Sequence, residues 1–140
     1  MKNKNLVLIT LLVLTMLTGS LLAGCGKSAD SNSIKIGLLN EMTGGNATFG
    51  TSAANGAKMA FKEINAKGGV LGKQILAVIA DNKSEPSESA NAMTKLATQD
   101  NVVAVTGVFA SSNAIAASSV AEATKTPFLA VGATNPKGTV

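Results

Sequence analysis

Residues 102–119 read VVAVTGVFASSNAIAASS, and this stretch decides the fold because a buried strand passes into a helix within it. A run of aliphatic side chains ends at Gly107, and small hydroxyl side chains follow at Ser111 and Ser112. We expect a helix to begin at one of these two serines. Serine is a favoured N-cap residue that contributes about 1 kcal/mol without any ligand. The pair therefore has two interpretations, as helix caps or as groups that also hold a ligand.

Short aliphatic runs alternate with longer helical patterns on both sides of this stretch. Continuous aliphatic strands separated by helices are typical of a parallel sheet with helices on both faces, a doubly wound α/β layer. The first helix should end at the glycines of Lys67-Gly68-Gly69, and Pro86 should lie in the first turn of the second. The expected strands are 34–40, 74–81, 102–107 and 127–132, and the first expected helix covers about 50–66.

The N-terminus has the order of a secretory signal. Two lysines precede the apolar run LVLITLLVLTML, and the small residues TGSLLAG follow it. Basic, apolar and small-residue regions in this order indicate export. The alternative is a membrane-spanning anchor, because the apolar stretch approaches the minimum of about 17 residues. Interspersed threonine, glycine and serine residues favour the signal.

LAGC, which ends at Cys25, resembles the lipobox of bacterial lipoproteins. The resemblance implies a diacylglyceryl thioether on Cys25, and a free cysteine is the alternative. We expect a lipoprotein signal peptide over 1–24, a polar tether over 25–33, and a folded domain over 34–140. The chain would then be exported and lipid-anchored to the outer face of the cytoplasmic membrane.

Composition excludes several classes of chemistry. The chain has no histidine and one cysteine, so we expect no His/Cys metal site, no catalytic triad and no internal disulfide. It has no Trp or Tyr to stack on bases, and its lysines are scattered, which disfavours a nucleic-acid partner. The first loop lacks the G-x-G-x-x-G spacing of a dinucleotide site. We therefore expect no cofactor and no enzymatic activity, and a structural or turn role for Asp81.

The remaining candidate for a site is the edge of the sheet. Ligands of open parallel sheets bind outside the carboxyl ends of the strands, where the loops NATFG, FASSN and GATNP should meet. A helix that begins at Ser111 or Ser112 would offer free N–H groups and a positive dipole end to a carboxylate. Thr134 could add a hydroxyl and an N–H group. Phe49 could line a pocket or belong to the core.

Several blocks of the sequence together resemble the N-terminal lobe of the branched-chain amino acid (leucine/isoleucine/valine) binding proteins of ABC transporters, type I periplasmic binding proteins. They are IKIGLLNEMTGGNATFG, GAKMAFKEINAKGGVLGKQI, DNKSEPSESANAMTKLATQDNVVAVTG and SSNAIAASSVAEATKTPFLAVGATNP. EINAKGGVLGK is the phrase most specific to the family. The resemblance covers nearly all of 34–140 and implies a Rossmann-like α/β lobe.

The resemblance also implies roles for individual residues. Ser111 would hold the α-carboxylate of the ligand, and Thr134 would contact both the carboxylate and the amino group. The Gly132 carbonyl would accept from the ammonium, with Ala133 beside it in the site, and Phe49 would line the side-chain pocket. The first loop lacks a proline that is common in the family, and SSNA has fewer hydroxyls. The nature of the ligand's side chain therefore stays open.

The function implied is that of an extracytoplasmic solute-binding subunit, which delivers an amino acid, most simply a branched-chain one, to ABC permease subunits. The alternative is a ligand sensor of the same fold for amides, urea or another small polar solute. Family members carry a second lobe that this sequence lacks, so we expect the chain to be a fragment or a truncated reading frame.

Overall fold

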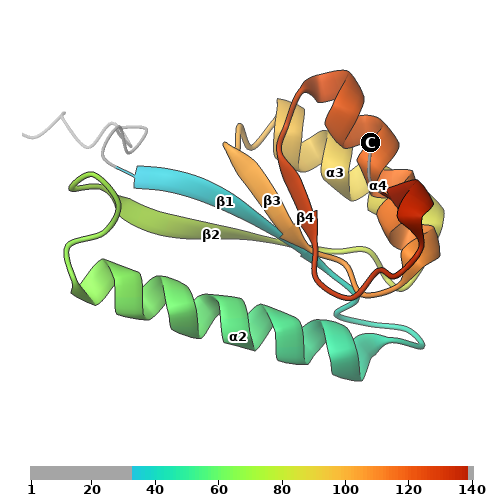
Figure 1. Cartoon of the computed structure of the whole chain (residues 1–140), viewed down its shortest axis with the longest axis horizontal. Helices are drawn as coiled ribbons and strands as arrows, with labels where there is room; N and C mark the ends of the chain where they lie inside the picture. Colours follow the sequence, from blue (N-terminus) through green and yellow to red (C-terminus); the bar gives the residue numbers. More distant parts are fainter. Residues whose placement is uncertain (1–32, 139–140) are drawn as a thin grey trace, which may run out of the picture. The chain divides into compact units, whose positions relative to one another are not determined.

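Four parallel strands form the sheet of residues 33–138, the part of the chain that this computed structural model describes (Figure 1). The strand order is β2-β1-β3-β4, so β1 lies at the centre and pairs with both β2 and β3. The strands are β1 (Ser33–Asn40), β2 (Gln74–Asp81), β3 (Ala104–Gly107) and β4 (Phe128–Ala130).

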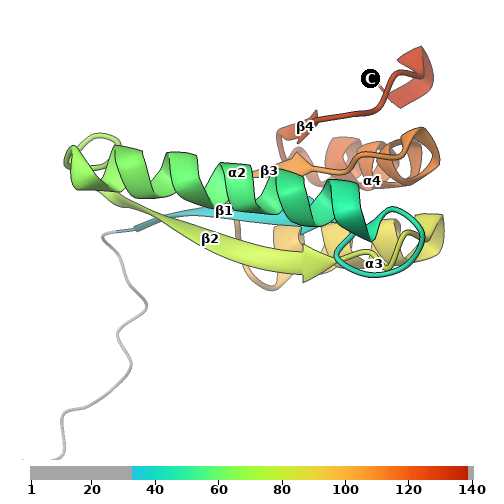
Figure 2. The same cartoon turned by 90° about the horizontal axis from the view of Figure 1, so that it is seen from below.

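Helices cover both faces of this sheet. The helices are α2 (Ala47–Ala66), α3 (Pro86–Thr98) and α4 (Ser111–Thr124), and the short 3-10 helix η2 (Pro136–Gly138) follows β4. Helix α2 lies on one face, and α3 and α4 lie side by side on the other (Figure 2). The predicted α/β class, with a parallel sheet and helices on both faces, is confirmed.

The main core lies between the sheet and the α3–α4 pair. Leu39 and Val105 project into it from neighbouring strands, and Met93 and Leu96 meet them from α3. Gly37 allows this close packing, because a Cβ atom there would lie 2.9 Å from a Val105 methyl group. The buried cluster consists of Leu39, Met93, Leu96, Val102, Val105, Val108, Ala114, Ala117 and Ala121.

Asn65 joins the last turn of α2 to the edge of the sheet. Its side chain donates to the Ile75 carbonyl at 2.8 Å and accepts from the Ile75 N–H at 2.7 Å. The backbone of the edge strand β2 is thereby paired where no further strand lies beside it. The helix ends at Lys67, and Gly68 and Gly69 follow with φ values of 102° and 78°, as the glycine signal predicts.

Element boundaries differ from the expected ones where tertiary contacts set them. Helix α2 begins at Ala47 instead of near Gly50, because Asn46 already accepts backbone bonds from Phe49 and Gly50. Strand β3 begins at Ala104, since the Val102 N–H is bound by the end of α3. Strand β4 is shorter than 127–132 at both ends.

The predicted signal peptide, Cys25 and the tether up to residue 32 lie outside the described residues. Across residues 33–138, none of the helices has the length and apolar character needed to cross a membrane.

Asn65→Ala should lower the free energy of unfolding by about 1–3 kcal/mol, because it leaves the Ile75 N–H and C=O groups without partners. Thr94→Ala is the matched control, since it removes one exposed side-chain hydrogen bond to Ala90 and should change stability by less than about 0.5 kcal/mol. Urea denaturation followed by circular dichroism measures both. Equal effects of the two substitutions would contradict the role given to Asn65.

Candidate functional site

The turn between β3 and α4 is held tightly against the centre of the sheet. Gly107 has φ 130°, and a Cβ atom at this position would overlap the Leu39 carbonyl oxygen. Val108 follows in the left-handed region with φ 58°, fully buried, and its N–H donates to the same Leu39 carbonyl at 2.8 Å. A β-branched residue rarely adopts this conformation, so its surroundings must enforce it.

The capping interpretation of the two serines is wrong. Helix α4 begins at Ser111, as expected, but its N-cap residue is Ala110, and no side chain of that residue caps the helix. Ser112 is exposed in the first turn, two positions after the N-cap residue. The sequence rule failed because the residues before Ser111 are held by a side chain from a distant loop.

That side chain is Glu41, which sequence reasoning missed. Its carboxylate is fully buried, and it accepts hydrogen bonds from Phe109 N (2.9 Å), Ala110 N (3.1 Å) and Asn113 Nδ2 (3.1 Å). Two of these donors are backbone groups directly before α4, where an anion is favoured by the helix dipole. The sequence signal that could have identified Glu41 is its position, since it is an acidic residue directly after the central buried strand.

Ser111 brings the last two predicted loops together. Its Oγ atom accepts from Thr134 N at 3.2 Å and from Asn135 N at 3.3 Å. Within residues 33–138 the hydroxyl has no acceptor for its own hydrogen. The first backbone bond inside α4 is donated by Ala114 to Ala110, so the N–H groups of residues 111–113 precede the hydrogen-bonded ladder. A hydroxyl and a set of amides thus meet at this edge.

Two aromatic rings form one wall beside these groups. Phe49, from the first turn of α2, stacks on Phe109 with ring centroids 4.3 Å apart and an interplanar angle of 2°. Phe49 remains 54% exposed, so it is not a core residue. Gly132 lies against the Phe109 ring, and a Cβ atom there would overlap it. Sequence reasoning identified Phe49 and Gly132 but missed Phe109, which belongs to the quoted FASSN loop.

Ala133 takes a different position from the other predicted site residues. Its side chain is half-buried and packs against the hydrophobic core under α4. The structure therefore brings Ser111 and Thr134 into contact, places both Phe49 and Gly132 against the Phe109 ring, and leaves Ala133 as support for the loop.

The loop before α2 is fixed by side chains at the end of β2 and just after it. Asp81 accepts from Met42 N at 2.9 Å, from Thr43 N at 3.2 Å and from the Thr43 hydroxyl at 2.7 Å. Ser84 donates to the Thr43 carbonyl at 2.7 Å and accepts from Asn46 N at 3.1 Å. The predicted turn role of Asp81 is confirmed, and through this loop it supports the start of the helix that carries the first aromatic ring.

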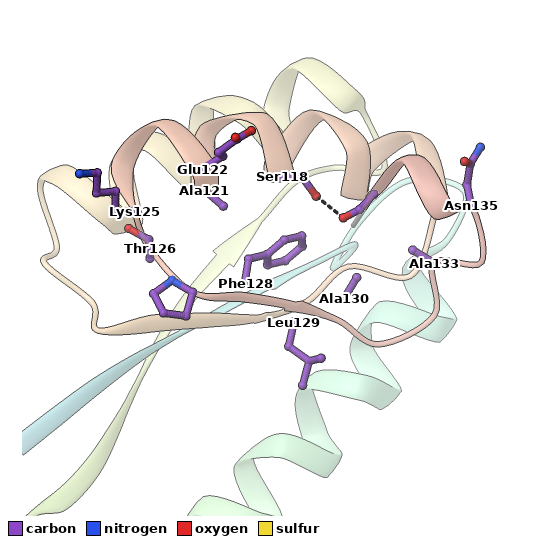
Figure 3. A pocket seen from close by; sticks show the side chains of 12 residues that line it. Ser118, Ala121, Glu122, Lys125, Thr126, Phe128, Leu129, Ala130, Ala133 and Asn135 are labelled. Atoms are coloured by element: carbon purple, nitrogen blue, oxygen red, sulfur yellow. Dashed lines mark hydrogen bonds between the residues drawn. The ribbon is translucent and has the colours of Figure 1, made fainter. Parts of the chain in front are cut away.

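A separate cavity of about 450 Å³ lies along the edge strand, between α4, β4 and η2 (Figure 3). The Phe128 ring lies between α4 and the strand, and Ser118 donates to the Gly138 carbonyl at 2.7 Å. Of the predicted site residues, only Ala133 lines this cavity. Within residues 33–138, no three His, Cys, Asp or Glu side chains are grouped as a metal site would need.

A parallel α/β layer with hydroxyl, amide and aromatic groups at the carboxyl ends of its strands defines a class of ligand-binding domain. Residues 33–140 match the family model described as periplasmic binding protein, and the chain belongs to this family. The resemblance inferred from the sequence is confirmed.

Individual relatives agree with this assignment. An amino acid binding protein of Pseudomonas aeruginosa is 39% identical over 106 residues, 76% of this chain and 28% of the relative. The solved structure of the branched-chain amino acid transporter substrate binding protein LivJ from Streptococcus pneumoniae, in complex with isoleucine, is 44% identical with a TM-score of 0.72. It is matched over 74% of this chain and 30% of its own.

A third neighbour was solved with a different ligand. The solute binding protein of an ABC transporter from Rhodopseudomonas palustris, in complex with 3,4-dihydroxy benzoic acid, is 28% identical with a TM-score of 0.67. The match covers 73% of this chain and 28% of the neighbour. The chain therefore spans less than a third of the length of each of these three relatives.

Hydrogen bonding at Asp81 makes stability depend on pH. Burial raises the pKa of the Asp81 carboxyl, but hydrogen bonds from Thr43, Lys83 and Met42 outweigh it and hold the pKa below its ordinary value of 3.8. A carboxyl group with a lowered pKa stabilises the fold at pH values above 3.8, and this contribution is lost as the pH falls through the folded-state pKa.

The free energy of unfolding should therefore differ most between the unsubstituted chain and Asp81→Asn above roughly pH 5, and the difference should narrow below roughly pH 3. Urea denaturation at a series of pH values measures it. Glu63→Gln, an equal change of charge on the exposed surface of α2, is the control and should show no such pH dependence. A difference that is constant with pH would contradict the role of the Asp81 charge.

Proposed function

We propose that the chain is the amino-acid-binding lobe of an extracytoplasmic solute-binding subunit of an ABC importer. The observation that carries the proposal is the contact between Ser111 and Thr134 at the N-terminus of α4. At this contact, a hydroxyl whose hydrogen has no acceptor among the described residues lies beside backbone N–H groups that precede the helical ladder. Such a group of donors, without a cation or metal, suits one carboxylate.

The ammonium and the side chain of an amino acid would also have complementary groups nearby. The Gly132 carbonyl is the proposed acceptor for the ammonium, and the Phe49–Phe109 stack is the proposed surface for an apolar side chain. Branched aliphatic side chains would bury apolar area on the exposed ring of Phe49. Supporting this choice, the LivJ neighbour was solved with isoleucine.

The proposal also includes membrane anchoring and delivery to a permease, for which the support is the signal and lipobox patterns of the sequence. A diacylglyceryl group on Cys25 would hold the protein at the outer face of the cytoplasmic membrane, and permease subunits would receive the ligand there. A second candidate ligand class is an aromatic carboxylate, because the Rhodopseudomonas palustris neighbour was solved with 3,4-dihydroxy benzoic acid. Both candidate ligands carry a carboxylate, which the donors at the start of α4 suit, but only the amino acid carries an ammonium.

Leucine titrated into the ¹⁵N-labelled full chain should shift the amide signals of Ser111, Ser112, Asn113 and Thr134. Isopentylamine, which keeps the side chain and ammonium but lacks the carboxylate, should leave them unchanged. Two-dimensional NMR resolves these signals and detects weak binding. Shifts with 3,4-dihydroxy benzoic acid but not leucine would favour the second ligand class, and shifts with isopentylamine would contradict the carboxylate site.

Ser111→Ala should weaken leucine binding at least about tenfold, the effect of losing one hydrogen bond to a charged group. Ser119→Ala is the matched control, since it removes a serine hydroxyl from the exposed side of the same helix, where it bonds only to Ile115. NMR titration gives both dissociation constants. Unchanged affinity with a lower melting temperature would mean that Ser111 serves only to hold Thr134 and Asn135.

A further inference from the structure

Glu41 is a buried charge that the proposed ligand contacts do not use. Its carboxylate is 0% exposed, and neither of the two ion pairs among the described residues includes it. Burying a carboxylate without a cation is costly, and three hydrogen bonds with the α4 dipole must offset that cost. A serine or aspartate at the N-cap would satisfy the first N–H groups of the helix without the cost of burying a distant carboxylate. Capping alone therefore does not explain Glu41.

Each bond of Glu41 fixes a different part of the candidate site. The bond from Phe109 N fixes the residue whose ring packs against Phe49 and Gly132. The bond from Ala110 N fixes the residue directly before Ser111. The bond from Nδ2 of the buried Asn113 fixes the first turn of α4.

The backbone of Glu41 lies directly against the first turn of α2. A Cβ atom at Gly50 would overlap the Glu41 carbonyl, so the helix packs directly on this residue. Glu41 thereby joins the loop after β1, the first turn of α2 and the turn after β3. It also uses only the amides of residues 109 and 110, which leaves the N–H groups of residues 111–113 for a ligand.

We propose that Glu41 is the positioning residue of the ligand site, which holds the left-handed turn at Val108 and the start of α4 in the binding arrangement before a ligand arrives. The inference rests on the proposed function, since the ligand is taken to be an amino acid. A pre-ordered set of donors binds more tightly because the cost of ordering it is met during folding. Without Glu41, the strained turn loses the two bonds at Phe109 and Ala110, and the first turn of α4 loses the bond at Asn113.

The test is Glu41→Gln in the full chain. Glutamine has the same shape, but its NH₂ group cannot accept, so it must face one of the three donors. We expect leucine affinity to fall at least about tenfold, and amide exchange at Phe109 and Ala110 in the free protein to become faster. NMR titration and hydrogen exchange measure the two effects.

Ser89→Ala separates positioning from stability. It removes a buried hydrogen bond of 2.8 Å, from Asn82, at the start of α3, far along the chain from the ligand donors. It should lower the melting temperature and leave leucine affinity within about twofold. An equal loss of affinity in Ser89→Ala and Glu41→Gln would overturn the positioning role, as would an unchanged affinity in Glu41→Gln.

Two further outcomes are decisive. If Glu41→Gln does not fold, Asn113→Ala replaces it, because this change removes one hydrogen-bond donor and keeps the Glu41 carboxylate. A loss of leucine affinity of about threefold or more in Asn113→Ala supports the proposal, and wild-type affinity overturns it. If leucine shifts no amide in the unsubstituted chain, the proposed function fails. The positioning role is then judged from exchange at Phe109 and Ala110, and exchange unchanged by Glu41→Gln or Asn113→Ala overturns it.

Discussion

The parallel pairing of β1 with both of its neighbours is the constraint on which the rest of the structure depends. Its register sets Asn40 opposite Asp81 on one side and Leu39 opposite Gly107 on the other. Three chain reversals therefore leave the sheet at one edge, within reach of one another. The long-range hydrogen bonds of Asp81 and Glu41, which span 38 to 72 residues of sequence, follow from that register. A slip of one residue would turn their side chains to the opposite faces.

The proposed binding mode would place two carboxylates at the N-terminus of α4, each bound by different backbone amides. Glu41 takes the amides of Phe109 and Ala110, and the proposed ligand carboxylate would take the amides that follow. Two anions at one helix N-terminus repel each other, so a ligand that also carries an ammonium fits this edge better than a simple anion. In the proposed binding mode, the Gly132 carbonyl would accept from that ammonium. Within the proposed function, this charge balance favours a zwitterion over a simple anion.

Sequence patterns predicted the elements well because local signals set them. Aliphatic runs marked the strands, the glycines after Lys67 ended α2, and Pro86 began α3. The cap of α4 could not be predicted in this way, because the donor groups before Ser111 are bound by a side chain about 70 residues earlier. Serine is a good local cap, but a buried carboxylate competes for the same amides. Phe109 was missed for a related reason, since its stacking partner Phe49 is on α2, far along the chain from the turn before α4.

Ser111 Oγ links the proposed ligand to the last loop of the site. This oxygen accepts from the amides of Thr134 and Asn135 at 3.2 and 3.3 Å, and both of those residues are exposed. These distances are longer than the common value for such bonds, so the two bonds themselves are weak. A hydroxyl that donates to an anion becomes a better acceptor, because bonded groups polarise one another. A carboxylate bound by Ser111 would therefore strengthen the two bonds that hold the loop, and an ordered loop would in turn favour the carboxylate, since such coupling is reciprocal.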